Sequence, residues 1–248
     1  MERHLISRIA HRHHPVAAPL FDGSVERLLA RALPERAERL LDLGCGEGAW
    51  LLRALAARPA LRAVGVDLDA EGLTRAREGA DRLGLTRRIG LHHQDAREFE
   101  AKEPFDAVLC IGSTHAFGGL VPTLGAIRPL LAPGGVAVVG EGYWQAEPDR
   151  ASLEIFGDGF ADLSGTVARV TAEGWTPVYG HASSAAELDE YEFAWTGSLA
   201  EWALDHPEDP GSAEALRVAG RHRDEWLDGY RGVFGFVTLV LRRSAAHP

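Results

Sequence analysis

The sequence predicts a doubly wound α/β fold built on a mostly parallel sheet. Short apolar runs alternate with segments of helical periodicity through the first 140 residues, which is the pattern of repeated βα units. The apolar run 105–111 is continuous, as expected for a parallel strand covered on both faces. A glycine-rich turn follows the first run, and acidic residues lie in or directly after three successive runs, near the strand ends where such sheets bind ligands.

Length and composition allow one large domain with a substantial core. The chain has 248 residues, of which 46% are hydrophobic, and a formal net charge of −10. The sequence has no lysine- or arginine-rich run, so nucleic-acid binding is not indicated. No apolar run approaches the length of a membrane span. The amino end lacks the apolar segment of a secretory signal, and the only cysteines are Cys45 and Cys110, without metal-ligand spacing. We expect a cytoplasmic protein, monomer or homodimer, with no metal, nucleic-acid or membrane partner.

The strands and helices follow from local patterns in chain order. The helix after the glycine turn has leucines at helical spacing, Ser24 is the expected N-cap of an earlier helix, and Gly84 ends a later one. The predicted strands are 39–43, 62–67, 89–92, 105–111, 136–140, 175–179 and 234–242. The predicted helices are 25–33, 49–57, 70–83, 120–131, 163–173, 184–205 and 212–231.

The turn itself leaves two cofactor classes open. Gly44, Gly46 and Ala49 fit the spacing G-x-G-x-x-G/A, so the glycines alone allow nicotinamide and flavin cofactors. Asp42 stands two residues before the first glycine, where its carboxylate would repel a pyrophosphate and attract a cation. S-adenosyl-L-methionine (SAM) carries an ammonium and a sulfonium. The acidic turn therefore favours SAM.

Residues 41–48, Leu-Asp-Leu-Gly-Cys-Gly-Glu-Gly, resemble the first motif of class I SAM-dependent methyltransferases. Leu-Leu-Ala-Pro-Gly-Gly at 130–135 also fits that family, and the resemblance spans residues 38–145 well. It implies a Rossmann-like, seven-stranded, mostly parallel sheet with an antiparallel last strand, SAM as methyl donor, and S-adenosyl-L-homocysteine as product. Residues 141–144, Glu-Gly-Tyr-Trp, together with the segment 112–119, Gly-Ser-Thr-His-Ala-Phe-Gly-Gly, resemble a bacterial subgroup of small-molecule methyltransferases.

The predicted organisation is a single methyltransferase domain over residues 1–248. An amino-terminal cap segment covers 1–33, the core covers 38–183 with 234–243, and a helical insertion covers 184–232. The insertion is expected to be helical because so long a structureless loop is improbable in a compact domain. The cap and the insertion are expected to cover the cleft.

Acidic side chains near strand ends are the expected cofactor contacts. Asp67 stands about 20 residues after the glycines, where a carboxylate accepts hydrogen bonds from ribose hydroxyls, and Leu68 would flank the adenine. The resemblance implies that Asp95 accepts a hydrogen bond from the adenine amino group and that Ala96 adds a backbone contact. Helix capping is the alternative for both aspartates. The predicted cofactor-binding residues are Asp42, Gly44, Gly46, Asp67, Leu68, Asp95, Ala96 and Ile111.

Methyl transfer needs aligned reactants, and it needs a base only if the acceptor must lose a proton. His115 is the first candidate base, His14 the second, with His11 and His13 beside it, and Glu141 would orient the acceptor. For His115 the alternative is a hydrogen bond to the backbone of the next turn. The predicted substrate-binding residues are Ser113, Tyr143, Trp144, Tyr191 and Trp195. For the aromatic residues core packing is the alternative.

The segment 112–119 lacks the Asn/Asp-Pro-Pro-Tyr/Phe pattern of many DNA and protein nitrogen methyltransferases, which favours a small-molecule acceptor. The predicted function is therefore N-, O- or C-methylation of a small molecule. Three other functions stay open: a SAM enzyme with another outcome such as cyclisation or decarboxylation, a nicotinamide-dependent oxidoreductase, and a SAM-binding protein without catalysis.

Overall fold

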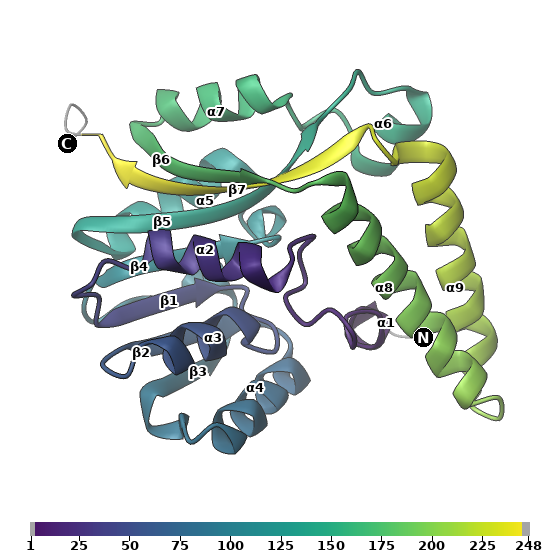
Figure 1. Cartoon of the computed structure of the whole chain (residues 1–248), viewed down its shortest axis with the longest axis horizontal. Coiled ribbons are helices and arrows are strands. Elements are labelled where there is room, and N and C mark those ends of the chain that lie inside the picture. The colour runs from purple at the N-terminus through teal and green to yellow at the C-terminus, as the bar shows by residue number, and fades with distance from the viewer. Residues whose placement is uncertain (1–2, 245–248) are drawn as a thin grey trace. The chain divides into compact units, whose positions relative to one another are not determined.

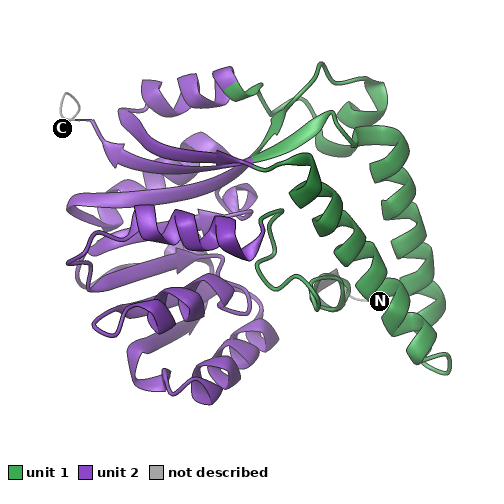
Figure 2. Ribbon diagram, viewed as in Figure 1, with its two compact units in different colours: residues 1–20, 142–163, 183–236 green, residues 21–141, 164–182, 237–248 purple. Residues whose placement is uncertain are grey.

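A computed structural model describes residues 3–244 of the chain, with side chains from residue 5 onward (Figure 1). The chain divides into two compact units (Figure 2). Unit 1 comprises residues 1–20, 142–163 and 183–236, and unit 2 comprises residues 21–141, 164–182 and 237–248. Unit 1 therefore contains most of the predicted cap and insertion, together with residues 142–163 of the predicted core. The prediction of one domain stays a prediction.

Seven strands form one sheet in the order β3-β2-β1-β4-β5-β7-β6, and most of it belongs to unit 2. Its strands are β1 (Arg39–Leu43), β2 (Arg62–Asp67), β3 (Ile89–His93), β4 (Phe105–Ile111), β5 (Leu131–Trp144), β6 (Trp175–Ala182) and β7 (Phe234–Arg243). β1 to β5 pair in parallel, and β7 pairs antiparallel to β6. The strand order reverses between β1 and β4, which is where a ligand crevice is expected. The predicted fold class is confirmed.

Helices cover both faces of this sheet. They are α2 (Asp22–Ala32), α3 (Ala49–Ala57), α4 (Ala70–Arg82), α5 (Leu120–Ile127) and α7 (Leu163–Ala172). Figure 1 shows α2 and α3 in front of the sheet and α5 behind it. Leu40 and Leu41 of β1 and Val108 and Leu109 of β4 are fully buried, because a parallel strand between two helical layers meets no water on either face.

Several predicted boundaries differ from the structure, most clearly those of α2, α5 and β5. α2 begins at Asp22 with Phe21 as N-cap, so the prediction of Ser24 as the cap is wrong: Ser24 is buried inside the helix, and its hydroxyl accepts a hydrogen bond from Arg27 at 2.9 Å. α5 gives way at Ile127 to a 3₁₀ turn, Arg128–Leu130, because a proline cannot continue α-helical hydrogen bonding. β5 extends beyond the predicted 136–140 at both ends.

Unit 1 is mainly helical. It contains α1 (Arg3–Ala10), α6 (Arg150–Phe156), α8 (Ala185–Asp205), α9 (Ser212–Asp224) and a π-helical turn, Glu225–Tyr230. α1 and α6 were not predicted, whereas the two insertion helices were. Ser184 and Glu187 form a capping box that fixes the start of α8. Within the described part of the chain, no helix is both long and apolar enough to cross a membrane.

An aromatic cluster lies in unit 1 where β5 ends and β7 begins. Phe156 and Phe234 stack with ring centroids 3.9 Å apart, and Trp144 meets Phe234 edge-on at 5.1 Å. Phe160 completes the cluster. Gly142 lies against this cluster, where a Cβ would overlap the ring of Phe234. Trp144 is therefore a packing residue of unit 1.

A buried carboxylate joins α8 to the π-helical turn and to α9. Glu192 is 8% exposed; its Oε2 lies 2.8 Å from His222 Nε2, and its Oε1 accepts a hydrogen bond from the Tyr230 hydroxyl at 2.9 Å. The ring of Trp195 stacks on His222 with centroids 4.0 Å apart. Both oxygens of Glu192 are thus satisfied. Removal of one donor would leave a buried charge without that partner.

We expect His222→Leu to lower the free energy of unfolding by about 3 kcal/mol, since the buried carboxylate of Glu192 then loses its partner at Oε2. The measurement is urea unfolding of the full chain. His206→Leu is the matched control, because His206 also stacks on a tryptophan, Trp202, but its Nδ1 bonds to a backbone carbonyl oxygen instead of a carboxylate.

A double variant separates this pairing from simple packing. Glu192→Leu/His222→Leu should be less destabilised than the sum of its single variants, because the uncompensated charge is then gone. Additive losses, or an equal loss in His206→Leu, would contradict the assignment.

Candidate functional site

The glycine-rich turn follows β1 in unit 2, and two of its glycines are required for different reasons. Gly44 has φ 85°, and a Cβ there would overlap the side chain of Ser113. Gly46 has φ 50°, but a Cβ there would meet open space. The first glycine therefore permits close packing of the chain on itself. The second leaves the backbone of the turn open to a ligand.

Asp67, at the end of β2, holds the turn in place. Its Oδ2 accepts a hydrogen bond from the Gly46 amide at 2.7 Å, and its Oδ1 accepts one from the Asp69 amide at 2.8 Å. Each carboxylate oxygen has further lone pairs for a ligand hydroxyl. Leu68 beside it is 60% exposed, an apolar surface that a flat ring could cover.

Asp95 follows β3 and caps the 3₁₀ turn Ala96–Glu98. Its Oδ1 accepts a hydrogen bond from the Arg97 amide at 2.9 Å, and its Oδ2 lies 2.5 Å from the Arg97 guanidinium. The hydrogen bonds from the Arg97 side chain and backbone lower the pKa of Asp95 to about 2. The capping alternative is therefore present in the structure. A contact between Asp95 or Ala96 and adenine stays a prediction.

Asp42 is the most unusual carboxyl group of unit 2. It is 3% exposed, and its Oδ2 has no hydrogen-bond partner among the described residues. Burial, and then the charge of Asp67, raise the pKa of Asp42 to about 8. A cation beside this group would favour its ionised form. The residues of this edge therefore fit a ligand that carries a positive charge, as SAM does.

Two further predicted residues lie at the same edge of the sheet. Ile111 of β4 pairs with Gly140 of β5, so Glu141 follows directly at the carboxyl ends of the strands. Ile111 and Glu141 are each 8% exposed. Burial raises the pKa of the Cys110 thiol, and the charges of Asp42 and Glu141 raise it further, so both carboxyl groups act on one thiol.

The loop after β4 brings the two remaining predicted residues of unit 2 to this edge. Ser113 packs on the glycine turn, with its Oγ 3.5 Å from the Gly44 carbonyl oxygen. His115 lies in the 3₁₀ turn Thr114–Phe117 and is exposed. Unit 2 thus places an exposed imidazole two residues beyond a serine that touches the turn.

Unit 1 gathers a second group of predicted residues. His11 Nδ1 lies 2.7 Å from the Ser7 carbonyl oxygen and must donate to it, so Nε2 accepts the hydrogen bond from the Tyr191 hydroxyl at 3.0 Å. Burial lowers the pKa of His11, which agrees with a neutral imidazole. His14 meets the Tyr191 ring edge-on at 5.5 Å, and its Nε2 donates to the Ala18 carbonyl at 2.8 Å. Only Nδ1 of His14 is left to accept a proton.

The structure also brings together titratable side chains that the sequence did not indicate as a group. Glu192, His222 and Tyr230 meet across separations of 30 and 38 residues, so no motif spacing could have revealed them. Trp195, predicted to bind substrate, stacks on this group. Tyr143 is 6% exposed, and its hydroxyl lies 3.4 Å from Gln145 Oε1.

The raised pKa of Asp42 predicts how stability depends on pH. Its folded pKa of about 8 exceeds the ordinary value of 3.8, so the folded protein binds this proton more tightly than the unfolded chain does. The resulting stabilisation is complete below pH 4 and is lost as pH rises through 8. Without cofactor, Asp42→Asn should remove this loss, making the variant more stable than the parent at pH 9 by several kcal/mol, up to about 5.

Urea unfolding at pH 5 and pH 9 measures the effect. Asp81→Asn, at an exposed position of α4, is the control and should follow the parent at both pH values. The assignment would be refuted if the free energy of unfolding changed between pH 5 and pH 9 by the same amount in the parent and in Asp42→Asn.

Comparisons with known proteins agree with this geometry. Residues 34–174 match the family described as "Methyltransferase domain". The Escherichia coli protein YjhP is 29% identical over 208 residues, which are 82% of this chain and 84% of YjhP. The dTDP-4-amino-2,3,4,6-tetradeoxy-D-glucose N,N-dimethyltransferase of Saccharopolyspora spinosa is 37% identical over 152 residues, 59% of this chain and 53% of that enzyme.

Among solved structures, a SAM-dependent methyltransferase from Geobacter sulfurreducens, in complex with S-adenosyl-L-homocysteine, superposes with a TM-score of 0.88 at 23% identity. The alignment covers 96% of this chain and 98% of that one, which shows a shared fold. The family match spans more than half of the chain. The chain therefore belongs to the class I SAM-dependent methyltransferases.

Proposed function

We propose that this methyltransferase transfers the methyl group of SAM to a nucleophilic atom of a small molecule. The observation that carries the proposal is the buried carboxyl group of Asp42, which lies at the end of β1 without a partner for Oδ2 among the described residues. The choice of acceptor class is supported by the segment 112–119 and by the relative from Saccharopolyspora spinosa, whose name describes a sugar nitrogen methyltransferase.

On this proposal, unit 2 holds the cofactor. Asp67 accepts hydrogen bonds from the ribose hydroxyls while it fixes the Gly46 amide. Leu68 covers one face of the adenine, and Asp95, Ala96 and Ile111 contact its edge. The carboxyl group of Asp42 attracts the ammonium group at the amino-acid end of SAM. Bound SAM supplies a methyl group already activated by its positive sulfur.

The acceptor is held by Ser113 and Glu141 of unit 2. Ser113 contacts Gly44, and Glu141 shares an electrostatic environment with Asp42, so both are placed to orient an acceptor beside the cofactor. His115 removes a proton from the acceptor where its chemistry requires this. The catalytic role of these residues is chiefly alignment in a site from which water is excluded.

The remaining residues proposed as substrate contacts belong to unit 1. Tyr191 and His14 form one surface with His11, and Trp195 lies on His222. Tyr143 and Trp144 are largely buried, so they would contact a substrate only with a small part of their surface. Trp144 is also part of the aromatic cluster. Cys45 and Cys110 are free and buried, which supports a reducing, cytoplasmic location.

Product analysis tests the reaction. Incubation with SAM and a panel of amino sugars, phenols and amines should give S-adenosyl-L-homocysteine together with an acceptor that has gained one methyl group, as measured by mass spectrometry. A rearranged SAM skeleton would indicate the alternative of another SAM chemistry. Binding of SAM without any product would indicate a non-catalytic protein. Either result would overturn the proposal.

Cofactor binding tests the role of Asp67. Asp67→Ala should weaken SAM binding at least tenfold by calorimetry, since it removes the ribose acceptor and releases the Gly46 amide. Asp69→Ala is the matched control, because Asp69 is the neighbouring carboxylate but caps α4 through the Glu71 amide. Equal affinities of the two variants would refute the assignment.

The pH dependence of turnover tests His115. With an acceptor found in the panel, His115→Gln should lower kcat/KM and abolish the fall of kcat/KM on the acidic side, because only a neutral imidazole accepts a proton. Affinity for S-adenosyl-L-homocysteine should not change. An unaltered pH profile would remove His115 from the mechanism.

A further inference from the structure

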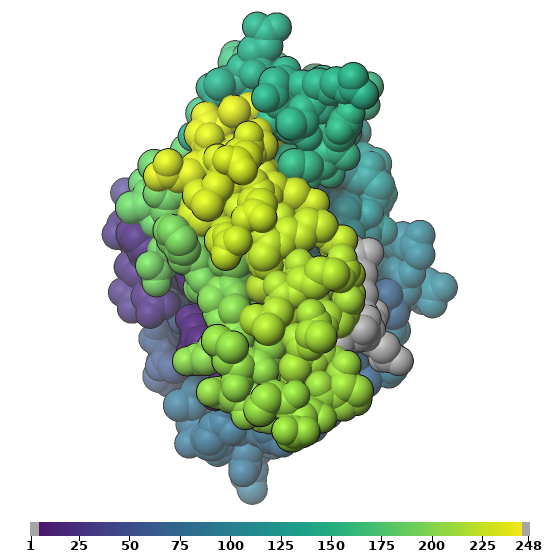
Figure 3. All heavy atoms as spheres, turned by 90° about the vertical axis from the view of Figure 1, so that its right-hand side faces the viewer, coloured from purple at the N-terminus to yellow at the C-terminus, as the bar shows by residue number. Residues whose placement is uncertain are grey.

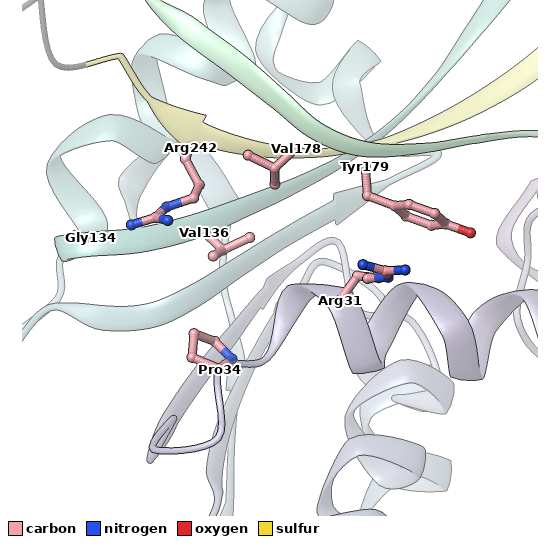
Figure 4. A pocket seen from close by; sticks show the side chains of 7 residues that line it. All are labelled: Arg31, Pro34, Gly134, Val136, Val178, Tyr179 and Arg242. Atoms are coloured by element: carbon pink, nitrogen blue, oxygen red, sulfur yellow. The ribbon is translucent and has the colours of Figure 1, made fainter.

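We propose that unit 2 carries a second ligand site, a pocket that binds a small organic anion between Arg31 and Arg242. Figure 4 shows this pocket, whose volume is about 430 Å³. It is lined by Arg31, Pro34, Gly134, Val136, Val178, Tyr179 and Arg242. The proposal goes beyond methyl transfer, and none of these residues belongs to the cofactor edge described above.

The first cationic wall comes from the last turn of α2. The guanidinium of Arg31 lies over the ring of Tyr179, 5.2 Å from its centroid. This packing restricts the orientation of the guanidinium, while the N–H groups at its edge stay available (Figure 4). A guanidinium held in this way is suited to a carboxylate or phosphate, which it binds through two parallel hydrogen bonds.

The second cationic wall comes from β7. Arg242 is exposed, and its guanidinium lies beside Gly134 at the start of β5 (Figure 4). Within residues 3–244, neither Arg31 nor Arg242 forms an ion pair, although the chain has 36 acidic and only 26 basic residues. Two like charges that line one pocket repel each other, and an anion bound between them reverses the sign of that interaction.

The rest of the lining is apolar. Val136 is 4% exposed, whereas Val178 is 49% exposed and leaves apolar surface in contact with water. Pro34 forms the opposite side (Figure 4). The preferred ligand therefore has an anionic group, which the positive charges of both arginines attract, and an apolar body, such as a ring, that covers the valines and the proline.

This pocket lies at the edge of the sheet opposite the cofactor residues. Pro34 precedes β1, Val136 stands near the start of β5, and Arg242 lies near the end of the antiparallel β7. Glu141 comes five positions after Val136 along β5, which corresponds to a distance of about 17 Å. Cofactor and anion therefore occupy separate sites of unit 2 and can bind together.

The test uses phenyl phosphate and benzoate as probes, with phenol as the neutral comparison. The full chain is first saturated with S-adenosyl-L-homocysteine, so that an anion has no access to the glycine turn. Calorimetry should then detect binding of at least one anion, and Arg31→Gln and Arg242→Gln should each weaken it tenfold or more. Arg62→Gln removes one exposed charge at the start of β2 and should leave binding unchanged.

Backbone amide chemical shifts give the second readout. Shifts induced by the bound anion should gather at Gly134, Val178 and Tyr179, and they also report whether each variant is folded. Tighter binding of phenyl phosphate would indicate a phosphate ligand, and tighter binding of benzoate would indicate a carboxylate ligand. The proposal fails if neither anion binds, if phenol binds as tightly, or if Arg62→Gln weakens binding as much as the pocket variants do.

Discussion

The hydrogen bond from the Gly46 amide to Asp67 is the interaction on which the cofactor edge depends. It ties the turn after β1 to the end of β2 at 2.7 Å, while the Asp69 amide fixes the other oxygen of the same carboxylate. A Cβ at Gly46 would meet open space, whereas Asp42 near the end of β1 is buried. The same carboxylate that shapes the turn also raises the pKa of Asp42, after burial itself.

Charge is distributed unevenly over unit 2. Carboxyl groups of Asp42, Asp67 and Glu141 gather where the parallel strands end, and this edge suits a cationic cofactor. At the other edge, Arg31 and Arg242 line a pocket that suits an anion. One sheet separates the two edges, so ligands of opposite charge need not compete for the same surface.

Unit 1 depends on polar groups that satisfy one another within its helices. Glu192 accepts from Tyr230 and pairs with His222, and Tyr191 donates to His11. Such pairs are costly to break when they are buried, and they restrict how α1, α8 and α9 can pack. They also fix the positions of Tyr191 and Trp195, which bond to His11 and stack on His222, respectively.

The sequence by itself determined the succession of strands and helices along the chain, the glycine turn, and the aspartates near strand ends, because strand and helix periods and glycine spacing are local properties of the chain. It did not decide whether Asp95 contacts the ligand or caps a helix, since either role places a carboxylate at a strand end. Only the tertiary structure decided that Asp42 lacks a partner for Oδ2 among the described residues, that Glu192 meets His222, and that Arg31 faces the same pocket as Arg242. These contacts join residues far apart in the chain, and packing, which no local period encodes, brings them together.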